Sequence, residues 1–121
     1  MTVLLNHTIV PSRDKVEAAR FFADVFGVAF QGVEGPFAVV RVNDSLTLDF
    51  DDSDPFQPYH FGFLVSDDEF DAILECVRAS GAPYGAGLAE GWNEQINHLN
   101  GGRGVYFQDP NGHSYEVFTR A

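Results

Sequence analysis

Basic residues are scarce in this chain of 121 residues, which has 7 Lys and Arg against 18 Asp and Glu and a formal net charge of −11 at pH 7. A field of this sign repels phosphate backbones and anionic lipid headgroups, so we expect neither nucleic acid nor a membrane surface as a partner. Long hydrophobic runs are also missing, since no segment approaches the roughly 20 apolar residues that span a bilayer. The first residues lack a basic segment followed by a long apolar stretch, so we expect no signal peptide and a cytoplasmic location.

Cysteine is nearly absent, because Cys76 is the only one in the sequence. An internal disulfide is therefore impossible, which is consistent with a reducing compartment. Apolar residues are plentiful instead: 45% of the chain is hydrophobic and 14% aromatic, with 12 Phe. This bulk is enough for one core without disulfide or structural zinc, so we expect a single domain over residues 1–121.

The apolar pattern of the first half recurs in the second half. Apolar residues at helical spacing precede Gly27 and again Gly81, and each glycine stands where a left-handed helix C-cap is expected. His7 and His60 are 53 residues apart, and the two glycines are 54 apart. Short β-type segments bounded by Gly, Pro, Asn and Asp surround both helices. The expected strands are residues 3–10, 28–33, 37–42 and 45–50, then 59–65, 83–87, 103–108 and 113–119.

This order predicts an α+β fold made of two βαβββ modules in tandem, module one over about 1–54 and module two over about 55–121. We expect the two modules to form a curved mixed sheet that bears a cleft. The segment 86–102 has no counterpart in the first half and is typical of an inserted loop, where substrate contacts are common.

Three potential metal ligands lie on these strands. His7 is expected in the middle of the first strand of module one, and His60 opens the first strand of module two. On the last strand Ser114, Glu116 and Phe118 share one face, because strand side chains alternate. A lone histidine on a strand is more often a structural residue, but the matched positions and the cost of burying an unpaired Glu116 carboxylate favour a shared site. Two imidazoles and one carboxylate would bind Fe, Mn, Zn or Ni as a divalent ion and leave positions open for substrate.

Three sequence motifs identify a family resemblance. The strand starts Leu5-Asn-His-Thr-Ile and Tyr59-His-Phe-Gly-Phe-Leu-Val, and the ending Gly104-Val-Tyr-Phe-Gln-Asp-Pro-Asn-Gly-His-Ser-Tyr-Glu-Val-Phe, resemble the vicinal oxygen chelate (VOC) superfamily. That group includes glyoxalase I, extradiol dioxygenases, fosfomycin-resistance transferases and bleomycin-resistance proteins. The resemblance covers essentially the whole chain and is more specific for the fold than for the reaction. It implies that His7, His60 and Glu116 hold a metal that acts as a Lewis acid on two adjacent substrate oxygens.

One position separates the branches of that superfamily. The resemblance implies that glyoxalase I binds its metal through four ligands. One of them is a carboxylate in the first module, at the position that matches Glu116. Alignment of residues 43–50 with 111–118 puts Leu48 opposite Glu116, and Asp49 is expected to face away. The sequence therefore predicts a three-ligand His-His-Glu site, as in the dioxygenase and fosfomycin-transferase branches.

Further candidates surround the expected metal site. His98 and Tyr106 are candidate catalytic residues, although an exposed loop histidine or a packed tyrosine would look the same in sequence. Trp92, Phe37 and Arg103 are candidates for the substrate pocket, the arginine for an anionic substrate, although aromatics are more often core residues.

These observations predict a divalent-metal-dependent enzyme of the superfamily that acts on a small molecule with vicinal oxygens, as a dioxygenase, a lyase or isomerase, or a transferase. The alternative is a metal-free, small-molecule binding protein like the bleomycin-resistance proteins, for which the negative charge would suit a cationic drug. A homodimer is expected in either case, because open sheets leave apolar faces and strand edges to cover. Family members also commonly dimerise.

Overall fold

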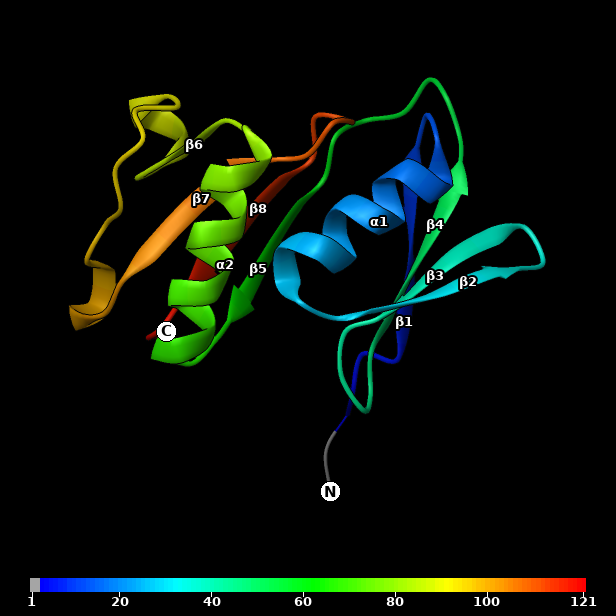
Figure 1. The fold of residues 1–121 in the computed structure, drawn as a ribbon, viewed down its shortest axis with the longest axis horizontal. Helices are drawn as coiled ribbons and strands as arrows, with labels where there is room; N and C mark the ends of the chain where they lie inside the picture. The colour runs from blue at the N-terminus through cyan, green and yellow to red at the C-terminus, as the bar shows by residue number, and fades with distance from the viewer. Residues whose placement is uncertain (1–2) are drawn as a thin grey trace. The chain divides into compact units, whose positions relative to one another are not determined.

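A computed structural model describes residues 3–121 and divides the chain into two compact units, one ending at Gln57 and the other beginning at Pro58 (Figure 1). Each unit contains a four-stranded mixed sheet and one α-helix. Across residues 3–121, none of the helices combines the length and apolar character that a membrane span requires.

The first unit has the strand order β1-β4-β3-β2. Strands β1 and β4 are parallel, and the other neighbours are antiparallel. Its elements are β1 (His7–Ser12), α1 (Lys15–Phe26), β2 (Ala29–Glu34), β3 (Phe37–Arg41) and β4 (Thr47–Asp52).

Helix α1 forms where its capping residues allow it and lies on one face of this sheet. The Asp14 carboxylate accepts a hydrogen bond from the Glu17 N–H at the N-terminus, and Gly27 ends the helix at φ 67°, a left-handed conformation that glycine adopts without strain. The fully buried Phe22 ring stacks on Phe26 at 4.1 Å and contacts Phe50 on β4. Burying each such ring contributes about 1.5–3 kcal/mol, so these contacts fix the helix on the sheet.

The turn between β3 and β4 sets which residues of β4 face this core. Asn43 Oδ1 accepts hydrogen bonds from the N–H groups of Ser45 and Leu46 and from the Ser45 hydroxyl. This turn aligns the two strands so that Thr47 pairs with Arg41. Strand residues 48 and 50 are then buried under α1, whereas residues 47 and 49 lie on the opposite face.

The second unit repeats the first with the strand order β5-β8-β7-β6. Strands β5 and β8 are parallel, as β1 and β4 are, and β8 pairs antiparallel with β7, as β4 does with β3. Two 3₁₀ turns, Leu88–Glu90 and Leu99–Gly101, lie in the segment between β6 and β7. The regular elements are β5 (His60–Leu64), α2 (Asp67–Ser80), β6 (Tyr84–Gly85), β7 (Gly104–Gln108) and β8 (Ser114–Phe118).

Helix α2 lies along one face of this second sheet (Figure 1). Ser66 and Glu69 form a reciprocal capping box at its N-terminus. The Arg103 guanidinium, at the start of β7, bonds the carboxylates of Asp67 and Asp71 at 3.1 and 2.7 Å and lies over the Phe70 ring at 4.6 Å. These contacts raise the pKa of Arg103 and connect the helix to the sheet.

A buried polar network closes the turn between β7 and β8. The Asp109 carboxylate accepts hydrogen bonds from the Asn111 and His113 N–H groups and from the Tyr115 hydroxyl. His113 is fully buried, and its Nδ1 accepts the Tyr59 N–H at 2.8 Å. Burial raises the pKa of Asp109 above its ordinary range and the pKa of Tyr115 well above 10.

The predicted α+β fold with two tandem βαβββ modules is confirmed, and several element boundaries are corrected. The first strand begins at His7 rather than at residue 3, so His7 opens its strand as His60 does. That strand also continues through Pro11, because β1 is an edge strand, where a missing N–H is tolerated. The strand expected at 83–87 is reduced to the two residues of β6.

Candidate functional site

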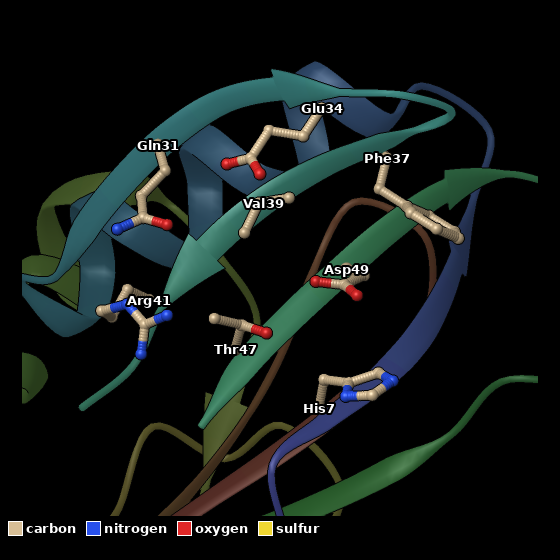
Figure 2. Close-up of a pocket in the computed structure, with 8 residues that line it drawn as sticks. All are labelled: His7, Gln31, Glu34, Phe37, Val39, Arg41, Thr47 and Asp49. Atoms are coloured by element: carbon tan, nitrogen blue, oxygen red, sulfur yellow. The ribbon is translucent and has the colours of Figure 1, made fainter. Parts of the chain in front are cut away.

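The face of the first sheet opposite α1 carries a polar pocket of about 310 Å³ (Figure 2). His7 on β1 pairs with Thr47 on β4, and Asp49 lies two residues further along the same strand. Apolar side chains of β3 form another part of the wall. The pocket is lined by His7, Gln31, Glu34, Phe37, Val39, Arg41, Thr47 and Asp49.

Asp49 lies on the same face of the sheet as His7 and lines the same pocket. Strand register pairs Val39 with Asp49 and, in the second unit, Tyr106 with Glu116, so Asp49 is the counterpart of Glu116. Leu48 is 1% exposed and packs in the core, so it cannot take that position. The expectation that Asp49 faces away was wrong, because the two turns do not align on Asn43 and Asn111.

The matching face of the second sheet gathers His60, Glu116 and Tyr106. His60 Nε2 lies 3.3 Å from Glu116 Oε1, and its side chain is 42% exposed against 19% for the glutamate. Tyr106 stacks on the His60 ring at 5.8 Å, and its phenol interacts with the Glu116 carboxylate. Desolvation and then the bond to Glu116 raise the pKa of Tyr106, so the phenol stays protonated at neutral pH.

Each histidine has an oxygen beside its Nδ1 atom. Asn6 Oδ1 lies 2.8 Å from His7 Nδ1, and Ser114 Oγ lies 2.8 Å from His60 Nδ1. An amide oxygen only accepts, so His7 carries its hydrogen on Nδ1 and a neutral ring leaves Nε2 as a bare lone pair. A serine hydroxyl can also accept, so His60 can adopt the same tautomer. This is the arrangement in which ligating histidines are usually held.

The two units therefore offer matched pairs of donors on equivalent strands, His7 with Asp49 and His60 with Glu116. Within residues 3–121 no group of three or more His, Cys, Asp or Glu side chains is gathered for metal binding. Two donor atoms that share one ion lie roughly 3 Å apart, because each is about 2.1 Å from the metal, and the His60–Glu116 pair meets this spacing.

The other residues predicted for catalysis or for the substrate pocket lie in separate parts of the two units. Phe37 lines the pocket with His7. Trp92 is 38% exposed and His98 is exposed, both in the segment between β6 and β7. Arg103 is engaged with α2, as described above, and its predicted substrate contact stays untested.

A second pocket, of about 230 Å³, borders Glu116 in the second unit. Residues that follow or flank His98 contribute to it, but His98 itself does not. It is lined by Asn97, Leu99, Asn100, Glu116, Phe118, Arg120 and Ala121.

Residues 4–117 match the sequence model of the Glyoxalase/Bleomycin resistance protein/Dioxygenase superfamily. The chain belongs to this superfamily. Among solved structures, the chain is similar to the protein described as oxidase ChaP-H2, with 46% identity and a TM-score of 0.94 over 100% of this chain and 96% of that one. Oxidase ChaP-H1 gives 44% identity and a TM-score of 0.91 over 99% and 98% of the two chains.

More distant superfamily structures share the architecture. A possible glyoxalase from Bacillus cereus is 25% identical, with a TM-score of 0.72 over 96% of this chain and 98% of that one. A fosfomycin resistance protein, FosX, from Listeria monocytogenes has 19% identity and a TM-score of 0.75 over 100% and 96%, which supports the fold alone. The superfamily and its fold, predicted from three sequence motifs, are thereby confirmed.

Proposed function

We propose that the chain is a divalent-metal-dependent oxidase that acts on a small molecule with two adjacent oxygens. The observation that carries this proposal is the matched pair of donors, one imidazole and one carboxylate at equivalent strand positions in each unit. The likeness to ChaP-H2 and ChaP-H1, both described as oxidases, supports oxidation over the isomerase and transferase alternatives.

His7, His60 and Glu116 are the proposed ligands, and Asp49 is proposed as a fourth. The Asp49 carboxylate forms no hydrogen bond or ion pair with another residue in the part of the chain that the structure describes, 3–121, although it lies in a pocket beside His7. A partly buried carboxylate of this kind is stabilised by a cation. This donor set of nitrogen and oxygen atoms suits Fe, Mn, Zn or Ni, and does not choose among them.

The residues around the donors support specific roles in such an enzyme. When bound, the metal would supply a Lewis acid for the two substrate oxygens. Ser114 and Asn6 would keep Nδ1 of each histidine occupied, so that Nε2 faces the ion. Tyr106, whose raised pKa keeps the phenol protonated at neutral pH, would hold the Glu116 carboxylate in position by donating a hydrogen bond to it. The catalytic role predicted for His98 stays a prediction.

Metal analysis of protein purified without chelators tests the proposal directly. We expect a bound divalent ion in the wild-type protein, and aerobic oxygen uptake that depends on it once a substrate is supplied. A metal-free binding protein of the bleomycin-resistance type would contain no ion above the level of a Glu116→Gln, Asp49→Asn double variant. That result would contradict the proposal.

Replacing Ser114 with alanine is expected to weaken metal binding by roughly 10- to 100-fold, the range seen when an outer-shell partner of a ligating histidine is lost. The reason is that His60 Nδ1 loses its oxygen partner at 2.8 Å, and the ring is free to change tautomer and rotate. Zinc affinity, measured by competition with a chromophoric chelator, checks this. Ser114→Thr keeps the hydroxyl and should restore the affinity, whereas equal affinities in all three proteins would refute the role.

We also propose a homodimer, because the edge strands of each sheet carry exposed apolar side chains. Ile9 on β1 is 48% exposed and Leu64 on β5 is 62% exposed. Light scattering should give twice the 13.3 kDa of one chain.

Mixing His7→Ala with His60→Ala protein then identifies the source of the ligands. Recovered metal binding would assign the two histidines of one site to different chains, and no recovery would assign them to the same chain.

A further inference from the structure

Arg41 is the basic side chain of the first-unit pocket, and no carboxylate is paired with it within residues 3–121. One Nη atom donates to the main-chain carbonyl of Asn43 at 3.2 Å. Other basic residues are engaged differently: Lys15 pairs with Asp52, and Arg103 pairs with two aspartates. In a chain with 18 acidic residues, this guanidinium is left available at a pocket wall.

The strand register fixes where Arg41 lies relative to the proposed ligands. Arg41 pairs with Thr47, and Thr47 pairs with His7, so the three residues form a row across β3, β4 and β1. Neighbouring strands are about 4.8 Å apart, which puts the backbone of Arg41 roughly 10 Å from that of His7. Figure 2 shows Arg41 beside Thr47 at one side of the pocket, and His7 and Asp49 near each other at the other side.

Beside Asp49, the wall of this pocket is partly apolar. Val39 is 8% exposed and pairs with Asp49, and Phe37 lines the same pocket. A substrate carbon skeleton about as long as one ring could lie against these two side chains while its two ends reach different polar groups. The same pocket also contains the Glu34 carboxylate, which opposes an anion. Anion binding would therefore depend on Arg41 and on the positive charge of the metal.

We propose that Arg41 binds an ionised group of the substrate, which is then a small organic acid. Its adjacent oxygens would face His7 and Asp49, and its anionic group would lie at the far end of the skeleton, against the guanidinium. Arginine suits this role because its planar fork bonds a carboxylate with two parallel N–H groups. The inference rests on the proposed metal site. It specifies, in addition, that the substrate is anionic and how long it is.

The probes are 3,4-dihydroxybenzoate and its neutral amide, 3,4-dihydroxybenzamide, bound to zinc-loaded protein and measured by calorimetry. Zinc is redox-inert, so the probes are not consumed. Wild-type protein should prefer the benzoate. Arg41→Ala should weaken benzoate binding roughly tenfold or more, as expected for the loss of a charge-assisted hydrogen bond, and leave amide binding within about twofold. Arg20→Ala is the matched control, since Arg20 lies on α1 over the Phe30 ring.

Several results would overturn the inference. Wild-type protein that binds neither probe, or that shows no preference for the benzoate, removes the anion site. An equal loss for both probes in Arg41→Ala, or the same loss in Arg20→Ala, assigns the effect to something other than the anionic group. A failure of the proposed metal site looks different: the amide would bind equally well with and without zinc, while an Arg41-dependent preference for the benzoate would still support the role of this residue.

Discussion

His60→Ala protein is expected to bind zinc more than about a hundredfold more weakly than the wild type, a larger loss than outer-shell changes produce. The imidazole supplies one donor atom, and its removal also leaves the neighbouring Glu116 carboxylate without its partner at 3.3 Å. Chelator competition at neutral pH measures the affinity, and circular dichroism checks that the fold is retained. His60 is exposed at the end of its strand, so the substitution should leave the core unchanged.

The control for this variant is His98→Ala, which removes another exposed histidine from the same unit. We expect its zinc affinity to match the wild type. Wild-type affinity in His60→Ala would exclude His60 as a ligand and favour the metal-free binding protein. Equal losses in both variants would point to nonspecific zinc binding by surface histidines.

Asp109→Ala is expected to lower the free energy of unfolding by about 3–5 kcal/mol, the cost of breaking a buried charged network by removing one partner. The substitution removes the acceptor of three hydrogen bonds, those donated by the Asn111 and His113 N–H groups and by the Tyr115 hydroxyl. Denaturant unfolding at neutral pH measures the loss. Asp24→Ala, on the exposed side of α1, is the control and should stay within about 0.5 kcal/mol of the wild type. Similar stabilities for the two variants would contradict a structural role for the network.

The same residue makes a pH dependence testable. Burial raises the pKa of Asp109 in the folded protein, although attraction to His113 opposes the shift, so the folded state binds this proton more tightly than the unfolded state. The resulting stability is present below the ordinary value of 3.8 and is lost as the pH rises through the folded pKa. Asp109→Asn cannot titrate. The difference in unfolding free energy, wild type minus Asp109→Asn, should therefore fall over this pH window, and a flat difference would show that the proton is bound equally in both states.

Local signals in the sequence were sufficient for much of the fold. Both helix ends at Gly27 and Gly81 were predicted correctly, because a left-handed C-cap is a property of one residue and its immediate neighbours. The equivalence of His7 and His60 was also visible, because their offset of 53 residues nearly equals the 54 residues between the two glycines. That His7 opens its strand, as His60 does, was not predicted. These features depend on short-range chemistry that repeats in the two halves.

Features that depend on strand pairing could not be read from the sequence. Asp49 was assigned to the wrong face, although the alternation of Leu48 and Phe50 with polar neighbours carried the signal. The contact of Asn6 with His7 could be recognised only once the position of the His7 ring was known. Likewise, that no carboxylate pairs with Arg41 could be recognised only from the side chains around it in the described structure. Arg103 looked equally available in sequence, but two aspartates one helical turn apart on α2 engage it.

The five-residue turn between β3 and β4 has a consequence for how this protein could change over time. Strand side chains alternate, so inserting or deleting one residue there would exchange the faces of the whole of β4. Asp49 would move into the core and Leu48 into the pocket. Asn43 holds the present length through its three hydrogen bonds. An exposed turn residue, which lies six positions before Asp49 and is not itself a candidate ligand, thus decides whether the first module presents a carboxylate or a hydrocarbon. A single insertion could separate four-donor from three-donor descendants.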